Sequence, residues 1–185
     1  MIAIHLCPPK AERPMSLLAS LFSRKDDRAP FRPLYAALIE RARLSHWYED
    51  GAVPDTIDGR FDMLAAMLSL TLIRMEALGL QGEGARLTEI FVEDMDGQVR
   101  QIGFGDLVVG KQIGKMMSAL GGRITAYRAA LAGETSLDEA VTRNIFRGDA
   151  PAPAALAHVC AGLRAFAGAL DATDAGALLA GTLPA

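Results

Sequence analysis

A glycine and lysine pattern in the second half of the chain has the spacing of a phosphate-binding loop. Gly105, Gly110 and Lys111 occupy the glycine and lysine positions of that motif. The next residue is Gln112, where magnesium coordination needs a serine or threonine hydroxyl, and no β-strand pattern precedes the segment. A helix start, with Asp106 near the positive end of the helix dipole, is the better interpretation.

Carboxylates gather in two places along the chain, and their oxygens are ligands that hard cations prefer. The members are Asp55, Asp58 and Asp62 in the first cluster, and Asp94 and Asp96 in the second. Neither cluster has the ligand order of an EF-hand loop, which ends in a glutamate. We predict turns and ion pairs instead, with Asp58 or Asp62 capping a helix. Arg60 is expected to pair with one of these carboxylates and to join the helix start to a turn at Asp94.

Histidine and cysteine recur at one spacing near both ends of the chain, as His5 with Cys7 and His158 with Cys160. Zinc sites normally need four ligands held at short loop spacings. We therefore expect a buried thiol and an ordinary histidine at Cys160 and His158. No serine or cysteine lies in the setting of an activated nucleophile. The sequence thus predicts no catalytic residue, no metal and no cofactor.

Length and charge limit the remaining classes of function. A chain of 185 residues suits one domain. A formal net charge of -3 gives no reason to expect nucleic acid as a partner. The presence of only two cysteines fits a reducing compartment, so we expect a cytoplasmic protein. In the central helices the longest uncharged run, Met63 to Ile73, is shorter than the roughly 20 residues of a membrane span, which argues against an integral membrane protein.

Apolar residues recur at helical spacing over most of the chain, and no segment alternates like a β-strand. We predict an all-α, single-domain bundle of about six helices. The helices are expected at residues 33–48, 58–78, 83–91, 106–131, 136–146 and 154–170. Asp94, Asp96 and Gly97 predict a turn or a kink, and Ser136 with Glu139 predicts a capping box. The expected parts are a flexible N-terminal arm (1–30), a helical domain (31–170) and a C-terminal tail (171–185).

The predicted helix 106–131 has two unequal faces. The large apolar side chains on one face are expected to be core: Val109, Ile113, Met116, Met117, Leu120, Ile124, Tyr127 and Leu131. The opposite face begins with Lys111 and Lys115 and has small residues at Gly114, Ser118 and Gly122, a spacing that lets a second helix approach closely. We predict a groove for an apolar partner helix, with the lysines available to lipid phosphates or acidic residues. Another helix of the same domain would need the same small residues, so both interpretations stay open.

Short motifs occur in a fixed order between Pro33 and Leu131. They include Val53 to Thr56, Asp58 to Met63, Asp94 to Asp96, Gly110 with Lys111, and Gly122 with Arg123. In order and spacing of these motifs, the chain resembles the ubiquinol-cytochrome c chaperone family. It departs from the usual family pattern at Gly114 and Gly121, where basic and aromatic residues are more typical.

The resemblance implies an α-helical, non-enzymatic assembly factor for the ubiquinol-cytochrome c reductase complex, one that binds newly made cytochrome b at the inner membrane. The alanine-rich composition fits a bacterial source. We expect a cytoplasmic protein peripheral to the inner membrane, with anionic lipid as a further contact and the segment Ser16 to Arg28 as a weak foothold. The predicted partner-binding residues are Lys111, Gly114, Lys115, Ser118, Gly122 and Arg123.

A small-ligand or lipid-binding helical module is the alternative function. Its cavity would be enclosed by methionines, namely Met63, Met67, Met75, Met116 and Met117. Methionine stripes are more often core. An enzyme has the least support, because no group of residues offers nucleophile, base and orienting group together.

Overall fold

Helices make up the regular structure, and no strand occurs within residues 26–101 and 106–183, the ranges that this computed structural model describes. The elements are η1 (Ala29–Phe31), α2 (Arg32–Ala42), α3 (His46–Glu49), α4 (Ile57–Ala77), α5 (Gln81–Gln101), α6 (Asp106–Leu131), α7 (Leu137–Asn144), α8 (Pro153–Asp171) and α9 (Ala175–Leu179). The prediction of an all-α fold is confirmed, and the arrangement is consistent with a single-domain bundle.

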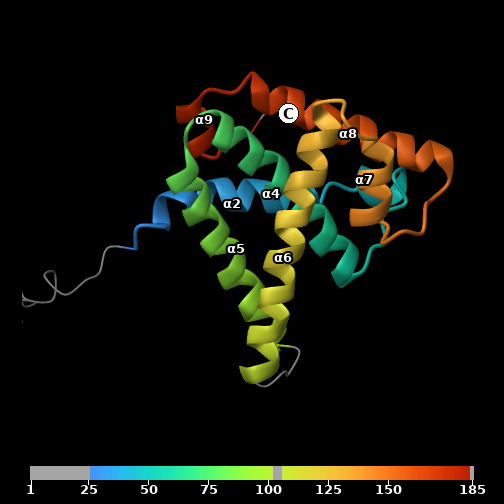
Figure 1. Ribbon diagram of the computed structural model, residues 1–185. Helices are drawn as coiled ribbons and strands as arrows, with labels where there is room; N and C mark the ends of the chain where they lie inside the picture. The colour runs from blue at the N-terminus through green and yellow to red at the C-terminus, as the bar shows by residue number, and fades with distance from the viewer. Residues whose placement is uncertain (1–25, 102–105, 184–185) are drawn as a thin grey trace, which may run out of the picture.

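Helix α4 lies at the centre of the fold, where it packs against α2, α5, α6 and α8 (Figure 1). Every residue from Asp62 to Thr71 is buried, because apolar side chains surround the helix on all sides. The buried Ser69 hydroxyl donates to the Ala65 carbonyl at 2.6 Å, and Thr71 donates to the Met67 carbonyl at 2.9 Å. These bonds satisfy polar groups that would otherwise destabilise the core.

The start of α4 differs from the prediction that Asp58 or Asp62 caps it. The cap is Thr56, whose hydroxyl oxygen accepts a hydrogen bond from the Gly59 amide at 3.1 Å. Gly59 has no substitute here, because a Cβ at this position would lie 1.9 Å from the Pro54 carbonyl oxygen. Asp58 and Asp62 are free to accept from arginines instead.

The C-terminal half of α5 and the N-terminal half of α6 project together from the rest of the molecule, and we call them the projecting pair (Figure 1). The predicted turn at Asp94 to Gly97 is wrong, since α5 runs through it without interruption. Met95 is buried, Asp94 accepts from a tyrosine on α2, and Asp96 pairs with Arg100 one turn later at 2.6 Å. These contacts outweigh the turn preference of the aspartates and glycine. Helix α6 has the predicted limits.

The first predicted helix is broken into α2 and α3 by a short turn. Trp47 donates its indole N–H to the Arg41 carbonyl at 2.9 Å, and the Tyr48 hydroxyl donates to the Ala42 carbonyl at 2.7 Å. Both carbonyls lie at the end of α2, where the helix leaves acceptors without partners. The aromatic side chains therefore cap α2. Gly162 on α8 lets the indole approach closely, because a Cβ there would lie 2.5 Å from the Trp47 ring.

The remaining predicted helices are found close to their expected limits as α7 and α8. Ser136 caps α7 by accepting from the Glu139 amide at 3.4 Å. Beyond α8, Asp174 caps the short helix α9, and Leu178 in that helix is fully buried. Gly181 packs against α2, with a Cβ there 2.8 Å from Pro33. The described part of the predicted tail is thus held against the helical domain.

Helix α8 is long and apolar enough to cross a membrane, by length and composition alone. Its inward side, which includes Val159, Leu163 and Phe166, is buried. It packs against α4 and α7. Helices in the core of globular proteins can be equally long and apolar, so length and composition alone do not make α8 a membrane span.

Candidate functional site

The small-residue side of α6 is exposed. We call its members the α6 face: Lys111, Gly114, Lys115, Ser118 and Gly122. A Cβ built at Gly114 or Gly122 would meet no heavy atom within 4 Å. Within the described chain, therefore, no neighbouring helix covers these two glycines.

The opposite side of α6 contributes to the core. Leu120 and Tyr127 are 2% and 0% exposed, and the partly buried side chains that pack beside them are Ile113, Met116, Met117 and Ile124. Leu131 is the exception at 40% exposed. The side chain of Val109 lies outside the described residues. The helix periodicity thus separates an inward side from the open α6 face.

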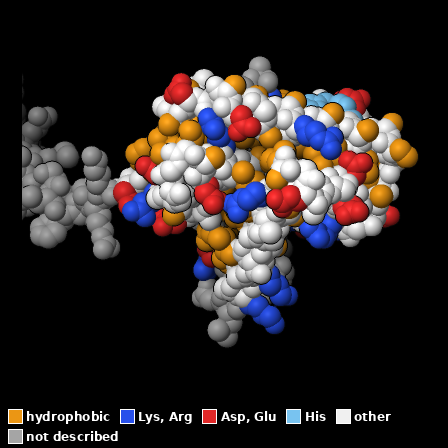
Figure 2. Space-filling view, turned by 45° about the horizontal axis from the view of Figure 1, so that its top comes forward, with side chains coloured by type: hydrophobic (Ala, Val, Ile, Leu, Met, Phe, Trp, Pro, Cys, Tyr) orange, Lys and Arg blue, Asp and Glu red, His pale blue; other side chains and the backbone are white. Residues whose placement is uncertain are grey.

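Basic side chains lie near the free end of the projecting pair, as Figure 2 shows. Lys111 and Lys115 are both exposed and stand one helical turn apart on α6. The α6 face therefore begins with positive charge and continues towards the body of the molecule as a surface of small residues. An apolar helix with an acidic or phosphate-bearing neighbour would complement it.

Arg123 is separated from the α6 face by its burial, since the residue is only 8% exposed. Its guanidinium pairs with Asp62 on α4 and donates to the Asn144 carbonyl on α7 at 3.3 Å. The guanidinium carbon also lies 5.4 Å from the centre of the Phe61 ring. Arg123, one of the predicted partner-binding residues, therefore joins three helices inside the fold and lies apart from the exposed α6 face.

Asp62 is the acceptor for a second arginine that sequence reasoning missed. Arg147 donates from Nε to Asp62 Oδ2 at 3.0 Å and pairs with Asp58 at 2.8 Å. Burial raises the pKa of the Asp62 carboxyl, and the hydrogen bond from Arg147 and the charge of Arg123 oppose that shift. Nothing in the sequence indicates this partner, because Arg147 follows Asp62 by 85 residues.

The other predicted ion-pair residues have separate roles. Arg60 pairs with Asp55 at 2.6 Å, as expected for one carboxylate of the cluster. The predicted link from Arg60 to a turn at Asp94 is wrong, since Asp94 lies within α5 and accepts from the Tyr35 hydroxyl at 2.7 Å. That hydroxyl has a raised pKa, first because of burial and second because of its bond to Asp94. Asp94 thereby holds α5 against α2.

Histidine and cysteine near the C-terminus do not form a shared site. Cys160 is buried as predicted, and burial raises the pKa of its thiol to about 12. His158 faces His46 instead, with Nε2 of the first 2.9 Å from Nδ1 of the second. The described residues include no group of three histidine, cysteine or acidic side chains placed to hold a metal. His5 and Cys7 lie outside the described residues.

Three methionines of the proposed ligand cavity are core residues. Met63 and Met67 are fully buried, and Met75 is 1% exposed. They pack with the leucines and aromatic residues around α4. Core packing accounts for these three methionines, as it does for most methionine stripes.

Comparison with known proteins decides the family. The family model described as ubiquinol-cytochrome C chaperone matches residues 49–185. The chain belongs to the ubiquinol-cytochrome c chaperone family. This chaperone is also similar to the protein in "Crystal structure of the Cbp3 homolog from Brucella abortus", with 31% identity, a TM-score of 0.74, and coverage of 90% of this chain and 95% of that chain. A search of curated proteins finds no match.

The family and the structural neighbour support an assembly chaperone for the ubiquinol-cytochrome c reductase complex, and they suggest a non-enzymatic factor. The family match continues past Leu131 through α7, α8 and α9, beyond the motifs on which the resemblance was based. In this chaperone, Gly114 and Gly121, at which the sequence is expected to depart from the usual family pattern, are both exposed. Both have open space around a built Cβ.

Proposed function

We propose that this chaperone binds newly made cytochrome b, and that the α6 face receives one of its apolar helices. The observation that supports this most directly is the open space at Gly114 and Gly122 on a helix that projects from the body. A soluble helix normally presents long polar side chains on its solvent side. Small residues four positions apart instead allow another backbone to come close.

Charge at the start of the α6 face fits such a client. Lys111 and Lys115 are exposed, and neither has an ion pair among the described residues. Their ammonium groups are suited to acidic residues that flank an apolar helix, or to lipid phosphates at a membrane surface. We therefore propose that the chaperone works on the cytoplasmic face of the inner membrane, with the projecting pair directed towards the client.

Capture of cytochrome b from solubilised bacterial membranes tests this proposal. The variant is Lys111→Glu with Lys115→Glu, which reverses the charge at the start of the α6 face. A matched control is Arg43→Glu with Arg164→Glu, two exposed arginines on α8 and next to α2. We expect the lysine variant to retain less than about a tenth of the captured cytochrome b, since each lost charge contact weakens binding by roughly 1 kcal/mol.

The control should capture cytochrome b at close to the wild-type yield, and both variants should keep the wild-type helix content. Equal capture by the lysine variant and the wild-type protein would refute binding through this end of α6. Absence of cytochrome b from the wild-type capture would refute the choice of client.

A further inference from the structure

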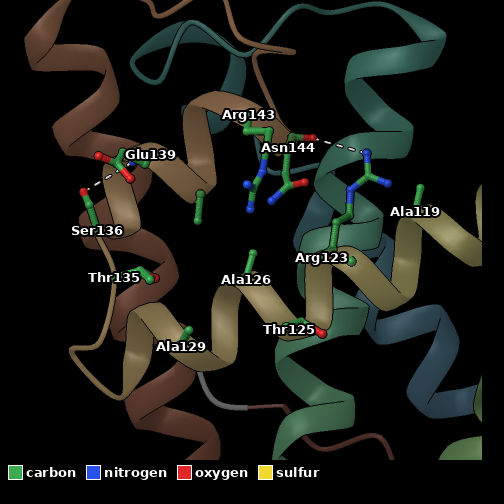
Figure 3. Close-up of a pocket in the computed structure, with 12 residues that line it drawn as sticks. Ala119, Arg123, Thr125, Ala126, Ala129, Thr135, Ser136, Glu139, Arg143 and Asn144 are labelled. Carbon is green, nitrogen blue, oxygen red and sulfur yellow. Dashed lines mark hydrogen bonds between the residues drawn. The ribbon is translucent and has the colours of Figure 1, made fainter.

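A hollow of about 660 Å³ opens between the C-terminal half of α6 and helix α7 (Figure 3). Its α6 side is made of small residues, among them Gly122, Ala126 and Ala129. Figure 3 shows the side chains of Arg143 and Asn144 pointing from α7 across the hollow towards α6. The volume is within the range of about 300–1,000 Å³ typical of ligand sites.

Hydrogen-bond donors around this hollow lack acceptors. Arg123 is 8% exposed and lines the hollow, and its Nε–H has no partner. The Nδ2 amide of Asn144 is likewise buried without a partner. Buried donors are nearly always satisfied in folded proteins, because an unmade hydrogen bond is unfavourable. Two such donors on facing helices indicate that an acceptor belongs between them.

Arg143, next to Asn144 in the chain, adds a positive charge to the lining of the hollow. Arg143 is exposed and forms no ion pair with any described residue. Glu139 lies one turn earlier on α7, at the spacing at which glutamate and arginine usually pair, yet its carboxylate is also unpaired within the described chain. The hollow therefore has a cationic end at Arg143 and an anionic end at Glu139.

We propose that this hollow binds a carboxylate carried by a peptide segment of a partner protein. The planar carboxylate offers acceptors to the guanidinium of Arg143 and to the amide of Asn144. The small residues of α6 leave room for the apolar side chain next to it. Glu139 accepts from the backbone N–H of the segment, and its negative charge opposes a doubly charged phosphate more strongly than a singly charged carboxylate. A chain terminus and a glutamate side chain both carry this group.

The inference goes beyond the proposed function, because the hollow lies on the body of the molecule and the α6 face begins on the projecting pair. Only Gly122 belongs to both. Peptide binding by the purified chaperone needs neither cytochrome b nor a membrane. The two proposals can therefore fail independently.

NMR titration of the full-length, isotope-labelled chaperone tests the carboxylate site. The probes are acetyl-Ala-Leu-Ala-Leu with a free terminal carboxylate, its terminal amide, and an amidated peptide with one internal glutamate. We expect saturable shifts of the Arg123 Nε–H and Asn144 amide signals with the free carboxylate, and binding weaker by about tenfold or more with the amide, since a charged hydrogen bond is lost. Binding of the glutamate peptide instead would identify a side-chain carboxylate as the source.

Two variants separate recognition from general charge. Arg143→Gln should weaken carboxylate binding by about tenfold, while Arg164→Gln, an exposed arginine of α8 that does not line the hollow, should leave it unchanged. Both substitutions are on the surface, so both proteins should keep wild-type spectra elsewhere. Unsaturable or absent shifts at the lining residues would overturn the proposal. Inorganic phosphate binding as tightly as the free carboxylate would overturn it as well.

Discussion

Asp62 on α4 and Arg123 on α6 form a buried ion pair across 61 positions of sequence. The pair lies on the same inward side of α6 as the buried side chains of Leu120 and Tyr127. With Arg123 held inward against α4, the line of Gly114, Ser118 and Gly122 is left outside. A charge contact at the centre of the fold therefore acts together with apolar packing to orient the proposed binding surface outward.

Removing the charge of Asp62 should destabilise the protein strongly. Asp62→Asn keeps the shape of the side chain and leaves Arg123 buried without its counter-ion. We expect the free energy of unfolding to fall by about 3–5 kcal/mol, the usual effect of breaking one half of a buried pair. Urea unfolding followed by circular dichroism measures this change.

The control is Asp55→Asn, which breaks the exposed pair with Arg60. This variant should unfold at nearly the wild-type urea concentration, because solvent-exposed pairs contribute little. A similar loss in both variants would mean that charge at the start of α4, and not the buried pair, determines stability.

Alanine at two glycines should change stability in opposite directions. Gly59→Ala places a Cβ 1.9 Å from the Pro54 carbonyl oxygen, so the backbone must shift. We expect a loss of roughly 2 kcal/mol, as in other overpacked sites. Gly114→Ala meets no atom within 4 Å and should raise stability by roughly 0.5–1 kcal/mol, because alanine favours the helix. Thermal unfolding of both variants measures the two changes in stability. Destabilisation by Gly114→Ala would indicate that α6 is packed at this position.

The contact between His46 and His158 should make stability depend on pH. Burial first, and the neighbouring His158 second, lower the pKa of His46 below 6.5; Asp50 opposes this shift and Arg41 adds to it. The unfolded chain therefore binds a proton at His46 more readily than the fold, so the stability contributed by neutral His46 is present above about pH 6.5 and is lost as the pH falls through the folded pKa of His46. We expect stability to decrease from about pH 7.5 to about pH 5.5.

Urea unfolding at both pH values measures this decrease, and His46→Gln should reduce it. The variant cannot gain a proton at this position, so its stability should change less over the same interval. An equal decrease in the wild-type protein and the variant would assign the pH dependence to other groups.

Patterns within short stretches of sequence were sufficient to predict much of the fold. The period of α6, the apolar surround of α4 and the Ser136 cap of α7 are all expressed within a few neighbouring residues. The α5 prediction was wrong because turn-forming residues at Asp94 to Gly97 were judged without their distant contacts. Tyr35, which holds Asp94, is 59 positions away. Tertiary contacts of that kind override local preference.

The exposed side of α6 was predictable to the same extent. Small residues at regular spacing identified one side of α6, and the structure leaves Gly114 and Gly122 open. Arg123 was predicted as a partner-binding residue, but a helix turns by about 100° per residue, and the position after Gly122 faces Asp62 on α4. Arg147 and the hollow between α6 and α7 had no local signal, since both arise from the docking of α7 beside α6.

Filling the α6 face should abolish client capture without harming the fold. Gly114→Leu and Ser118→Leu each place a bulky side chain where a partner helix would approach, and leucine favours the helix at least as well as either residue. Gly168→Leu is the matched control, because it is an exposed glycine of α8 whose Cβ would also meet no atom within 4 Å. All three variants should keep the wild-type helix content and melt no lower than the wild-type protein, and only the two α6 variants should lose cytochrome b in capture from membranes. A fall in melting temperature confined to the α6 variants would show that this side is packed inside the protein in solution. If both α6 variants captured as much cytochrome b as the wild-type protein, the α6 face would be ruled out as the contact.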